Sequence, residues 1–179
     1  LARFGVTEID AVHLGLMRKR CADLAACNPG LRVSFNGEKF RFANFAKYCE
    51  MYDTVAVHES SPRWSVAFGP SKDGHQQVSF ANSAETRDGG THVDHVVRQV
   101  VDGLREMIAK KHKVDVKPGE IRNHLFVFVS ATVDNPSFST QTKERLITDP
   151  KDFGGTHEVS QKLIKAVFAS EAVQGILDW

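Results

Sequence analysis

The pattern of apolar and polar positions divides the chain into three parts: a helix with a hairpin, a strand-rich region around one long helix, and two short helices. The first helix is indicated by apolar side chains at helical spacing. They are Ile9, Val12, Leu16 and Leu24. Thr7 and Asp10 have the spacing of a capping box, which predicts a helix that begins near residue 8.

A hairpin and a short helix follow. Apolar residues alternate over 31–35 and again over 40–42, and Asn36-Gly37 lies between the two runs. Asn-Gly in that position is the strongest local signal for a two-residue turn. We therefore predict a β-hairpin here, with a short helix over residues 45–52.

The central region alternates at strand spacing. Runs around 55–57, 64–68 and 77–80 predict three strands, with a turn over 69–74, and we expect them to form a meander. Thr91 with Asp94 again has capping-box spacing and predicts the start of a long helix. Its apolar face consists of Val93, Val97, Val100, Leu104 and Met107.

A further strand is predicted over residues 124–133, and two helices are predicted over 159–167 and 173–177. Strands, a long helix and a further strand predict an α+β fold. We expect a two-layer sandwich with a mostly antiparallel sheet and helices on one face.

Composition limits the function classes. The chain has 179 residues, of which 41% are hydrophobic and 25% charged, so it accommodates one domain, or one domain and part of another. A net charge of +1 argues against a protein that coats a polyanion, so any nucleic-acid contact must be a local patch. Three cysteines without zinc-site spacing favour a reduced, intracellular setting. The chain has no apolar run long enough to predict a membrane span. We expect the chain to be part of a longer protein.

The segment that combines the most chemistry follows the predicted strand 124–133. Residues 135–143 read Asn-Pro-Ser-Phe-Ser-Thr-Gln-Thr-Lys, a polar loop on a rigid strand. Gln141, Thr142 and Lys143 supply an amide, a hydroxyl and an ammonium, which together are able to hold a phosphate. The alternative is a solvated loop with a surface lysine.

Three blocks of the chain resemble the ATPase region of type II DNA topoisomerases. One is the loop itself, Asn135-Pro136, Phe138 and then Gln141-Thr142-Lys143-Glu144. The second is residues 77–82 (Gln-Val-Ser-Phe-Ala-Asn) with 89–94 (Gly-Gly-Thr-His-Val-Asp), and the third is residues 149–154 (Asp-Pro-Lys-Asp-Phe-Gly). The resemblance covers nearly the whole chain. The short spacings look closest to the large subunit of tailed-phage topoisomerases, with eukaryotic enzymes next.

This resemblance implies a division of the chain. Residues 1–54 are expected to be the end of a GHKL nucleotide-binding domain. Residues 55–179 are expected to be a transducer domain, a ribosomal-protein-like split β-α-β fold. In this family the Gln-Thr-Lys loop reaches into a neighbouring ATP pocket, so the resemblance assigns Gln141, Thr142 and Lys143 to the γ-phosphate of ATP.

The resemblance also implies partners. The full enzyme is expected to use ATP and magnesium, to pass one DNA duplex through another, and to close a homodimeric gate. This piece alone is expected to bind neither ATP nor magnesium. It is also expected to be inactive, because no catalytic residue and no metal ligand set is predicted on it. The location follows the source: a nucleus for a eukaryotic protein, the host cytoplasm for a phage protein. No membrane partner is expected.

A second candidate site lies at the end of the long helix, where Lys110, Lys111 and Lys113 cluster. Cations are favourable at any helix C-terminus, which is the structural alternative. Eukaryotic relatives carry a similar lysine cluster assigned to DNA contact, so the resemblance implies DNA binding. Two other functions stay open: a nucleic-acid-binding module of the same fold without a nucleotide role, and a mismatch-repair or chaperone type of GHKL ATPase.

Overall fold

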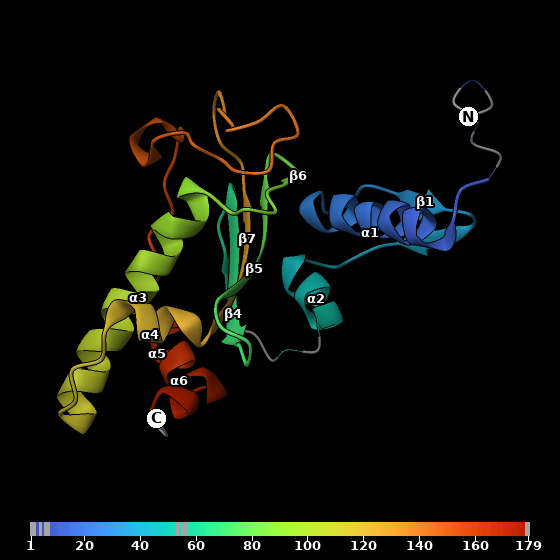
Figure 1. Cartoon of the computed structure of the whole chain (residues 1–179). Coiled ribbons are helices and arrows are strands. Elements are labelled where there is room, and N and C mark those ends of the chain that lie inside the picture. Colours follow the sequence, from blue (N-terminus) through green and yellow to red (C-terminus); the bar gives the residue numbers. More distant parts are fainter. Residues whose placement is uncertain (1–2, 4, 6–7, 53, 55–56, 178–179) are drawn as a thin grey trace. The chain divides into compact units, whose positions relative to one another are not determined.

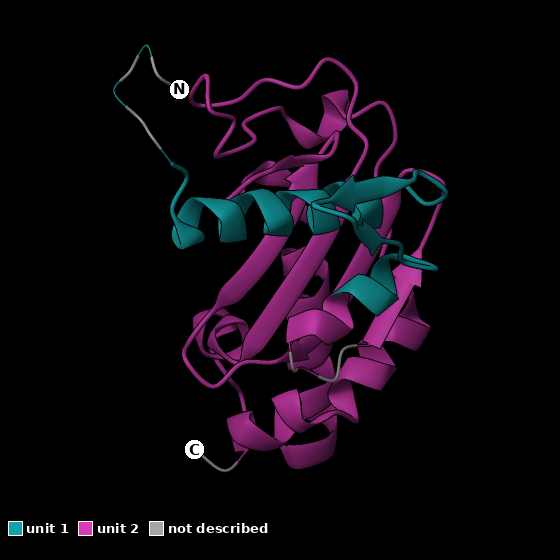
Figure 2. Ribbon diagram, turned by 90° about the vertical axis from the view of Figure 1, so that its right-hand side faces the viewer, with its two compact units in different colours: residues 1–48 teal, residues 49–179 magenta. Residues whose placement is uncertain are grey.

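The computed structural model describes residues 3, 5, 8–52, 54 and 57–177. The chain forms two compact units, residues 1–48 and residues 49–179 (Figure 2). Each unit has its own buried residues. Thr7 and Val55, which were part of the predicted first cap and first strand, lie outside the described residues.

The first unit begins with helix α1, Ala11–Cys27. Its N-cap is Asp10, whose carboxylate accepts a hydrogen bond from the His13 amide at 2.8 Å. The predicted start near residue 8 is therefore wrong by three residues. Asp10 binds the orphan amide of the first turn itself, instead of serving as the acidic residue of a turn that had already begun.

The predicted hairpin is confirmed. Strands β1 (Val33–Phe35) and β2 (Glu38–Phe40) pair antiparallel. Asn36 and Gly37 both have positive φ, 49° and 83°, as a type I′ turn requires. The short helix is confirmed as α2 (Phe45–Cys49), which continues as the 3₁₀ turn η2 (Glu50–Tyr52).

The second unit is built on a five-stranded sheet with the order β3-β4-β7-β5-β6. The strands are β3 Val57–Ser60, β4 Trp64–Pro70, β5 Gln76–Ala81, β6 Ala84–Glu85 and β7 Leu125–Ala131. All neighbouring pairs are antiparallel except β5 and β7, which are parallel. The sheet is mostly antiparallel, as predicted.

The predicted meander is wrong, because β7 is inserted between β4 and β5. Val129 pairs with Val66 on one side and with Ser79 on the other. β7 is apolar along nearly its whole length and most of its residues are buried. A strand of that kind is favoured at the centre of a sheet, where both of its faces are covered.

Helices cover one face of this sheet (Figure 1). They are α3 Thr91–His112, α4 Pro118–Asn123, α5 Gln161–Phe168 and α6 Glu171–Leu177, with the short 3₁₀ turn η3 Pro150–Asp152 before the last two. The apolar face of α3, including Val93, Val100 and Leu104, is buried in the same core as β7. The α+β sandwich predicted from the sequence is confirmed.

The predicted capping box at the start of α3 is wrong. The N-cap is Gly90, and no side chain caps the helix. The Thr91 hydroxyl is buried without a protein partner. Asp94 instead binds Arg122 at 3.0 Å and lies 3.6 Å from Arg145. The Asp94 carboxylate therefore does not cap the helix but holds two distant parts of the unit together.

A buried histidine lies in the first turn of α3. His92 is fully buried, and its Nε2 lies 3.1 Å from the Thr86 hydroxyl. Burial lowers the pKa of His92 to about 3; the Asp94 carboxylate opposes this shift, and the Arg145 cation adds to it. His92 is therefore neutral in the folded protein over the whole physiological range.

This burial predicts a pH-dependent stability. Below pH 6.5 the unfolded chain takes up a proton at His92 and the folded chain does not. The free energy of unfolding is therefore unaffected by this group above that pH and decreases as the pH falls toward 3. Between pH 7 and pH 5 the loss from this one group is about 2 kcal/mol. Urea unfolding of the wild type and of His92→Gln at both pH values measures it. The wild type should lose about that much more stability than the variant, and equal losses would contradict the assignment.

Candidate functional site

The loop that follows β7 rises from one end of the sheet (Figure 1, orange). It folds back on itself: Phe138 and Leu146 form an isolated bridge, and the Ser139 amide donates to the Arg145 carbonyl at 3.0 Å. At its tip the side chains of Gln141, Thr142 and Lys143 are exposed. The structure therefore places all three predicted phosphate-contacting residues side by side at the outer end of an ordered hairpin.

The tip has a defined conformation. Lys143 has a positive φ of 62°, and its amide donates to the Thr140 carbonyl at 3.1 Å. The hydroxyls of Thr140 and Thr142 are 2.9 Å apart. A lysine in left-handed conformation is uncommon, and such positions concentrate at functional sites.

The charge of Lys143 is not neutralised in the part of the chain that the structure describes. Its ammonium lies 5.6 Å from the centre of the Phe138 ring, and no carboxylate pairs with it. A cation over an aromatic face keeps its hydrogen-bond donors available. The arrangement presents a free point charge beside an amide and a hydroxyl.

The charges on either side of the tip have structural partners. Glu144 binds the Arg87 guanidinium. Arg145 donates to the Asp88 carbonyl at 2.9 Å and lies 3.6 Å from the Asp94 carboxylate. The residues after the tip therefore fix the loop to the start of α3, which leaves Lys143 as the cation available to a ligand.

The exit of the loop is held by backbone contacts around Gly90. The Leu146 amide donates to the Gly89 carbonyl, and the Leu146 carbonyl accepts from the Thr91 amide, both at 3.1 Å. A Cβ built on Gly90 would lie 2.3 Å from the Leu146 oxygen, and Gly90 has a φ of 137°. Only glycine permits this approach. The Gly-Gly pair before α3 thus positions the loop.

The entrance of the loop is held by Asn82. Its side chain donates to the Val133 carbonyl at 2.9 Å and accepts from the Val133 amide at 2.7 Å. The Asp134 amide donates to the Phe153 carbonyl at 3.0 Å, and Arg63 binds the Asp134 carboxylate at 2.7 Å. The segments 77–82, 89–94 and 149–154 that the sequence singled out therefore all close around the base of one loop.

Sequence reasoning gave no positioning role to Asn82, Arg145 or Arg63. Asn82 follows a strand and has a positive φ of 50°, so its residue type carried a local turn signal. The two arginines gave no signal, because their partners lie 51 or more residues away along the chain.

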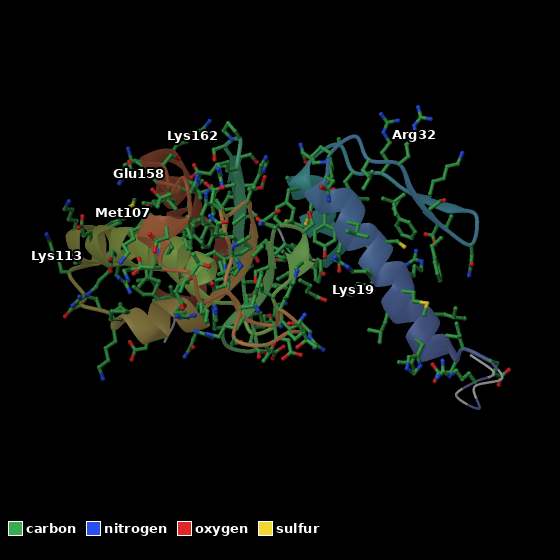
Figure 3. The ribbon with its side chains drawn as sticks, turned by 90° about the horizontal axis from the view of Figure 1, so that it is seen from above. Lys19, Arg32, Met107, Lys113, Glu158 and Lys162 are labelled. Atoms are coloured by element: carbon green, nitrogen blue, oxygen red, sulfur yellow. The ribbon has the colours of Figure 1, made fainter. Side chains whose placement is uncertain are left out.

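The second candidate set lies at the other end of α3. Lys110 and Lys111 are exposed, and Lys113 is the C-cap, with a φ of 60°. The Lys111 ammonium lies 5.2 Å from the Phe168 ring centre, so Lys111 also packs against α5. Lys113 extends from the end of the unit (Figure 3). A helix of 22 residues is about 33 Å long, so the two candidate sets are separate sites.

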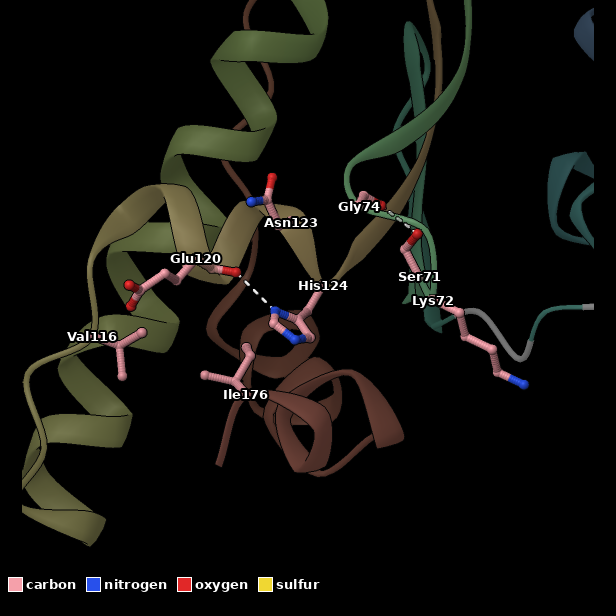
Figure 4. A pocket seen from close by; sticks show the side chains of 8 residues that line it. All are labelled: Ser71, Lys72, Gly74, Val116, Glu120, Asn123, His124 and Ile176. Atoms are coloured by element: carbon pink, nitrogen blue, oxygen red, sulfur yellow. Dashed lines mark hydrogen bonds between the residues drawn. The ribbon is translucent and has the colours of Figure 1, made fainter. Parts of the chain in front are cut away.

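Another hollow lies at the opposite end of β7 from the loop. This pocket of about 260 Å³ is lined by the turn after β4 together with α4 and α6 (Figure 4). Within it the His124 imidazole bonds the Glu120 carbonyl at 2.9 Å. Its lining holds one lysine, Lys72, and the carboxylate of Glu120, which is a poor arrangement for a phosphate.

Among the described residues, no His, Cys, Asp and Glu side chains form a group of three or more that would hold a metal ion. Burial raises the pKa of the Cys49 thiol to about 12, which makes this cysteine a poor nucleophile. Of the helices described, none is long and apolar enough to cross a membrane.

Comparison with known proteins identifies the family. The family model described as DNA gyrase B matches residues 35–179. The chain belongs to the DNA gyrase B family. It is 40% identical to DNA topoisomerase 2-beta of Mus musculus and 38% identical to DNA topoisomerase 2 of Drosophila melanogaster, each over 192 aligned positions. Both alignments cover 100% of this chain, but it spans only 12% and 13% of those relatives.

Solved structures agree with this gyrase B assignment. The ATPase region of Saccharomyces cerevisiae topoisomerase II superposes with a TM-score of 0.90 at 35% identity, over 99% of this chain and 47% of that one. The ATPase and transducer domains of topoisomerase II from Balamuthia mandrillaris superpose with a TM-score of 0.87 at 37% identity, over 93% of this chain and 44% of that one. The B-subunit of DNA gyrase from Myxococcus xanthus shares the fold, with a TM-score of 0.64 at 20% identity. This gyrase-B-family chain is part of the ATPase region of a type II topoisomerase.

The contact at Gly90 predicts the effect of one methyl group. Gly90→Ala should destabilise the chain by about 1–3 kcal/mol, because the added Cβ forces the Leu146 backbone away. Hydrogen exchange should show faster exchange of the Leu146 and Thr91 amides. Gly119→Ala is the matched control, since a Cβ there meets nothing within 4 Å. Equal protection of both amides in the two variants would show that Gly90 does not hold the loop.

Proposed function

We propose that this chain is the transducer region of an ATP-dependent type II DNA topoisomerase, joined to the end of its nucleotide-binding domain. It couples ATP binding and hydrolysis to closure of a dimer and passage of one DNA duplex through another. The observation that carries this proposal is Lys143, an unneutralised cation at the tip of a loop whose base is rigidly held.

The magnitudes suit a switch. A pair of unit charges about 4 Å apart is worth roughly 4 kcal/mol at an effective dielectric near 20. A neutral hydrogen bond from Gln141 or Thr142 adds about 0.5–1.5 kcal/mol. Moving a two-state equilibrium from 1:99 to 99:1 takes about 5.5 kcal/mol. Lys143 with one or two neighbours on the γ-phosphate therefore holds two domains together while ATP is intact and releases them after hydrolysis.

The proposed domains are residues 1–54, the end of a GHKL nucleotide-binding domain, and residues 55–179, the transducer. The division into compact units between Tyr48 and Cys49 supports a boundary in this region. Helix α1 also exposes large apolar side chains, Val12 at 70% and Leu16 at 60%. An exposed apolar stripe of this kind suits a helix whose packing partner belongs to the rest of the nucleotide domain.

The whole enzyme is proposed to be an ATP-hydrolysing isomerase that acts as a dimer on double-stranded DNA, with ATP and magnesium held by residues outside this chain. Its location is the nucleus if the source is eukaryotic and the host cytoplasm if it is a phage. The phage-type subtype is supported by length: alignments of 192 positions cover the 179 residues of this chain, so it carries deletions relative to the animal relatives.

The lysines at the end of α3 are proposed to contact DNA. Lys110 and Lys113 are exposed and have no carboxylate partner among the described residues. Lys111 lies on the Phe168 ring, so we assign it a smaller part in binding.

The decisive experiment is Lys143→Ala in the full-length enzyme. Binding of a non-hydrolysable ATP analogue and the accompanying dimer closure should weaken, and ATP hydrolysis should slow. ADP affinity should hardly change, because ADP has no γ-phosphate. Gln141→Ala should act in the same direction but more weakly, since it removes a neutral hydrogen bond.

Equal losses of analogue and ADP affinity in Lys143→Ala would assign the lysine to folding or general binding and reject the switch. Lys143→Arg is the matched control for charge. It retains the cation but replaces a compact ammonium with a wide planar fork, and we expect it to restore only part of the closure.

The DNA contact is tested by Lys110→Glu with Lys113→Glu in the full-length enzyme. If each lysine contacts one phosphate, the slope of log affinity against log salt becomes shallower by about 2. DNA-stimulated ATP hydrolysis should fall and the basal rate should persist. A slope equal to that of the wild type would leave the lysines as helix-end electrostatics.

A further inference from the structure

The β1–β2 hairpin of the first unit has two chemically different faces. Val33 pairs with Phe40, and Ser34 pairs with Lys39. Side chains alternate between the faces of a strand, so Arg32, Ser34, Lys39 and Arg41 share one face. Val33, Phe35 and Phe40 share the other face.

The apolar face is the one that packs against α1. Phe40 is buried, and the Arg18 guanidinium of α1 lies 5.5 Å from its ring centre. Glu38, the acidic residue of the hairpin, is on this face too and binds Arg18 at 2.7 Å. The cationic face consequently points away from α1 and has no acidic residue of its own.

The cationic face is open to a ligand. A groove of about 530 Å³ is lined by residues 30–34 and 39–41, none of which is acidic. Arg32, Lys39 and Arg41 are all exposed, and within the described part of the chain no carboxylate pairs with them. Figure 3 shows the Arg32 side chain extending outward from the hairpin on the side away from α1.

Two like charges flank the open end of the hairpin. Arg32 and Arg41 are the residues next to the last observed pair, Val33 with Phe40. Like charges near each other are unfavourable, and a bound polyanion would offset their repulsion. Among the described residues no carboxylate pairs with either arginine.

We propose that this cationic face binds the phosphate backbone of duplex DNA, an inference that rests on the proposed topoisomerase function. Lys39 and Arg41 are two residues apart on one strand, about 6.8 Å, which is the scale of the spacing between neighbouring phosphates along one DNA strand. The groove is lined by two arginines and a lysine without an acidic residue, which suits contacts to the phosphate backbone.

The salt dependence of binding gives the expected magnitude. Three phosphate contacts contribute about 2.7 to the slope of log affinity against log salt, which corresponds to a roughly 40-fold change in affinity between 50 and 200 mM salt. Removing the three cations removes that part of the salt dependence.

The experiment replaces Arg32, Lys39 and Arg41 together with Gln in the full-length enzyme. The matched control replaces three exposed lysines of the second unit, Lys72, Lys162 and Lys165, with Gln. Affinity for two short labelled duplexes of unrelated sequence is measured over a salt series, and thermal unfolding checks that both variants fold.

In the hairpin variant the slope of log affinity against log salt should become shallower by about 2 to 3 on both duplexes. The control should keep the wild-type slope. A wild-type slope in the hairpin variant overturns the proposal, as does a loss on one duplex only. A loss of ATP-analogue affinity in place of DNA affinity would make the groove a nucleotide site and overturn it too. Failure of the wild type to pass DNA strands with ATP would reject the topoisomerase function instead, so the two failures are distinguishable.

Discussion

The approach of the Leu146 backbone to Gly90 is the constraint on which the candidate site depends. Two hydrogen bonds on either side of Gly90 tie the exit of the loop to the first turn of α3, at a distance that no side chain permits. Asn82 holds the entrance of the same loop through two bonds to Val133. Because both ends are fixed to the sheet and the long helix, the tip is displayed from a rigid base although it is exposed.

The charged residues around the tip differ in whether they have structural partners. Glu144 and Arg145 are next to Lys143 in sequence, but both are engaged with partners at the start of α3. The Lys143 ammonium lies beside the Phe138 ring, and no carboxylate of the described residues pairs with it. A rigid support with a cation that has no carboxylate partner among the described residues suits the phosphate contact proposed for this tip, because little ordering cost is left to be met when the contact forms.

The positive charges of this chain are unevenly distributed over its surface, although its net charge is only +1. A total of +1 argues against a general polyanion binder, and yet cations gather at the end of α3 and on one face of the β1–β2 hairpin. In the hairpin the strand alternation separates the cations from the apolar residues. In α3 the lysines occupy the last turn, where the helix dipole favours them in any case.

The sequence by itself determined the elements whose signals are local. Asn36-Gly37 requires positive φ and predicted the hairpin, the spacing along α3 predicted its buried face, and the run before Asn135 predicted a strand with a polar loop after it. The resemblance of three blocks to topoisomerase ATPase regions predicted the family that the comparisons confirm. Only the tertiary structure decided that β7 lies between β4 and β5, that Gly90 is the N-cap of α3 without a side-chain cap, and that Asp94 binds two arginines. Periodicity records which side of an element is buried, but the partner of a strand or a charge is chosen by long-range packing, which leaves no local pattern in the chain.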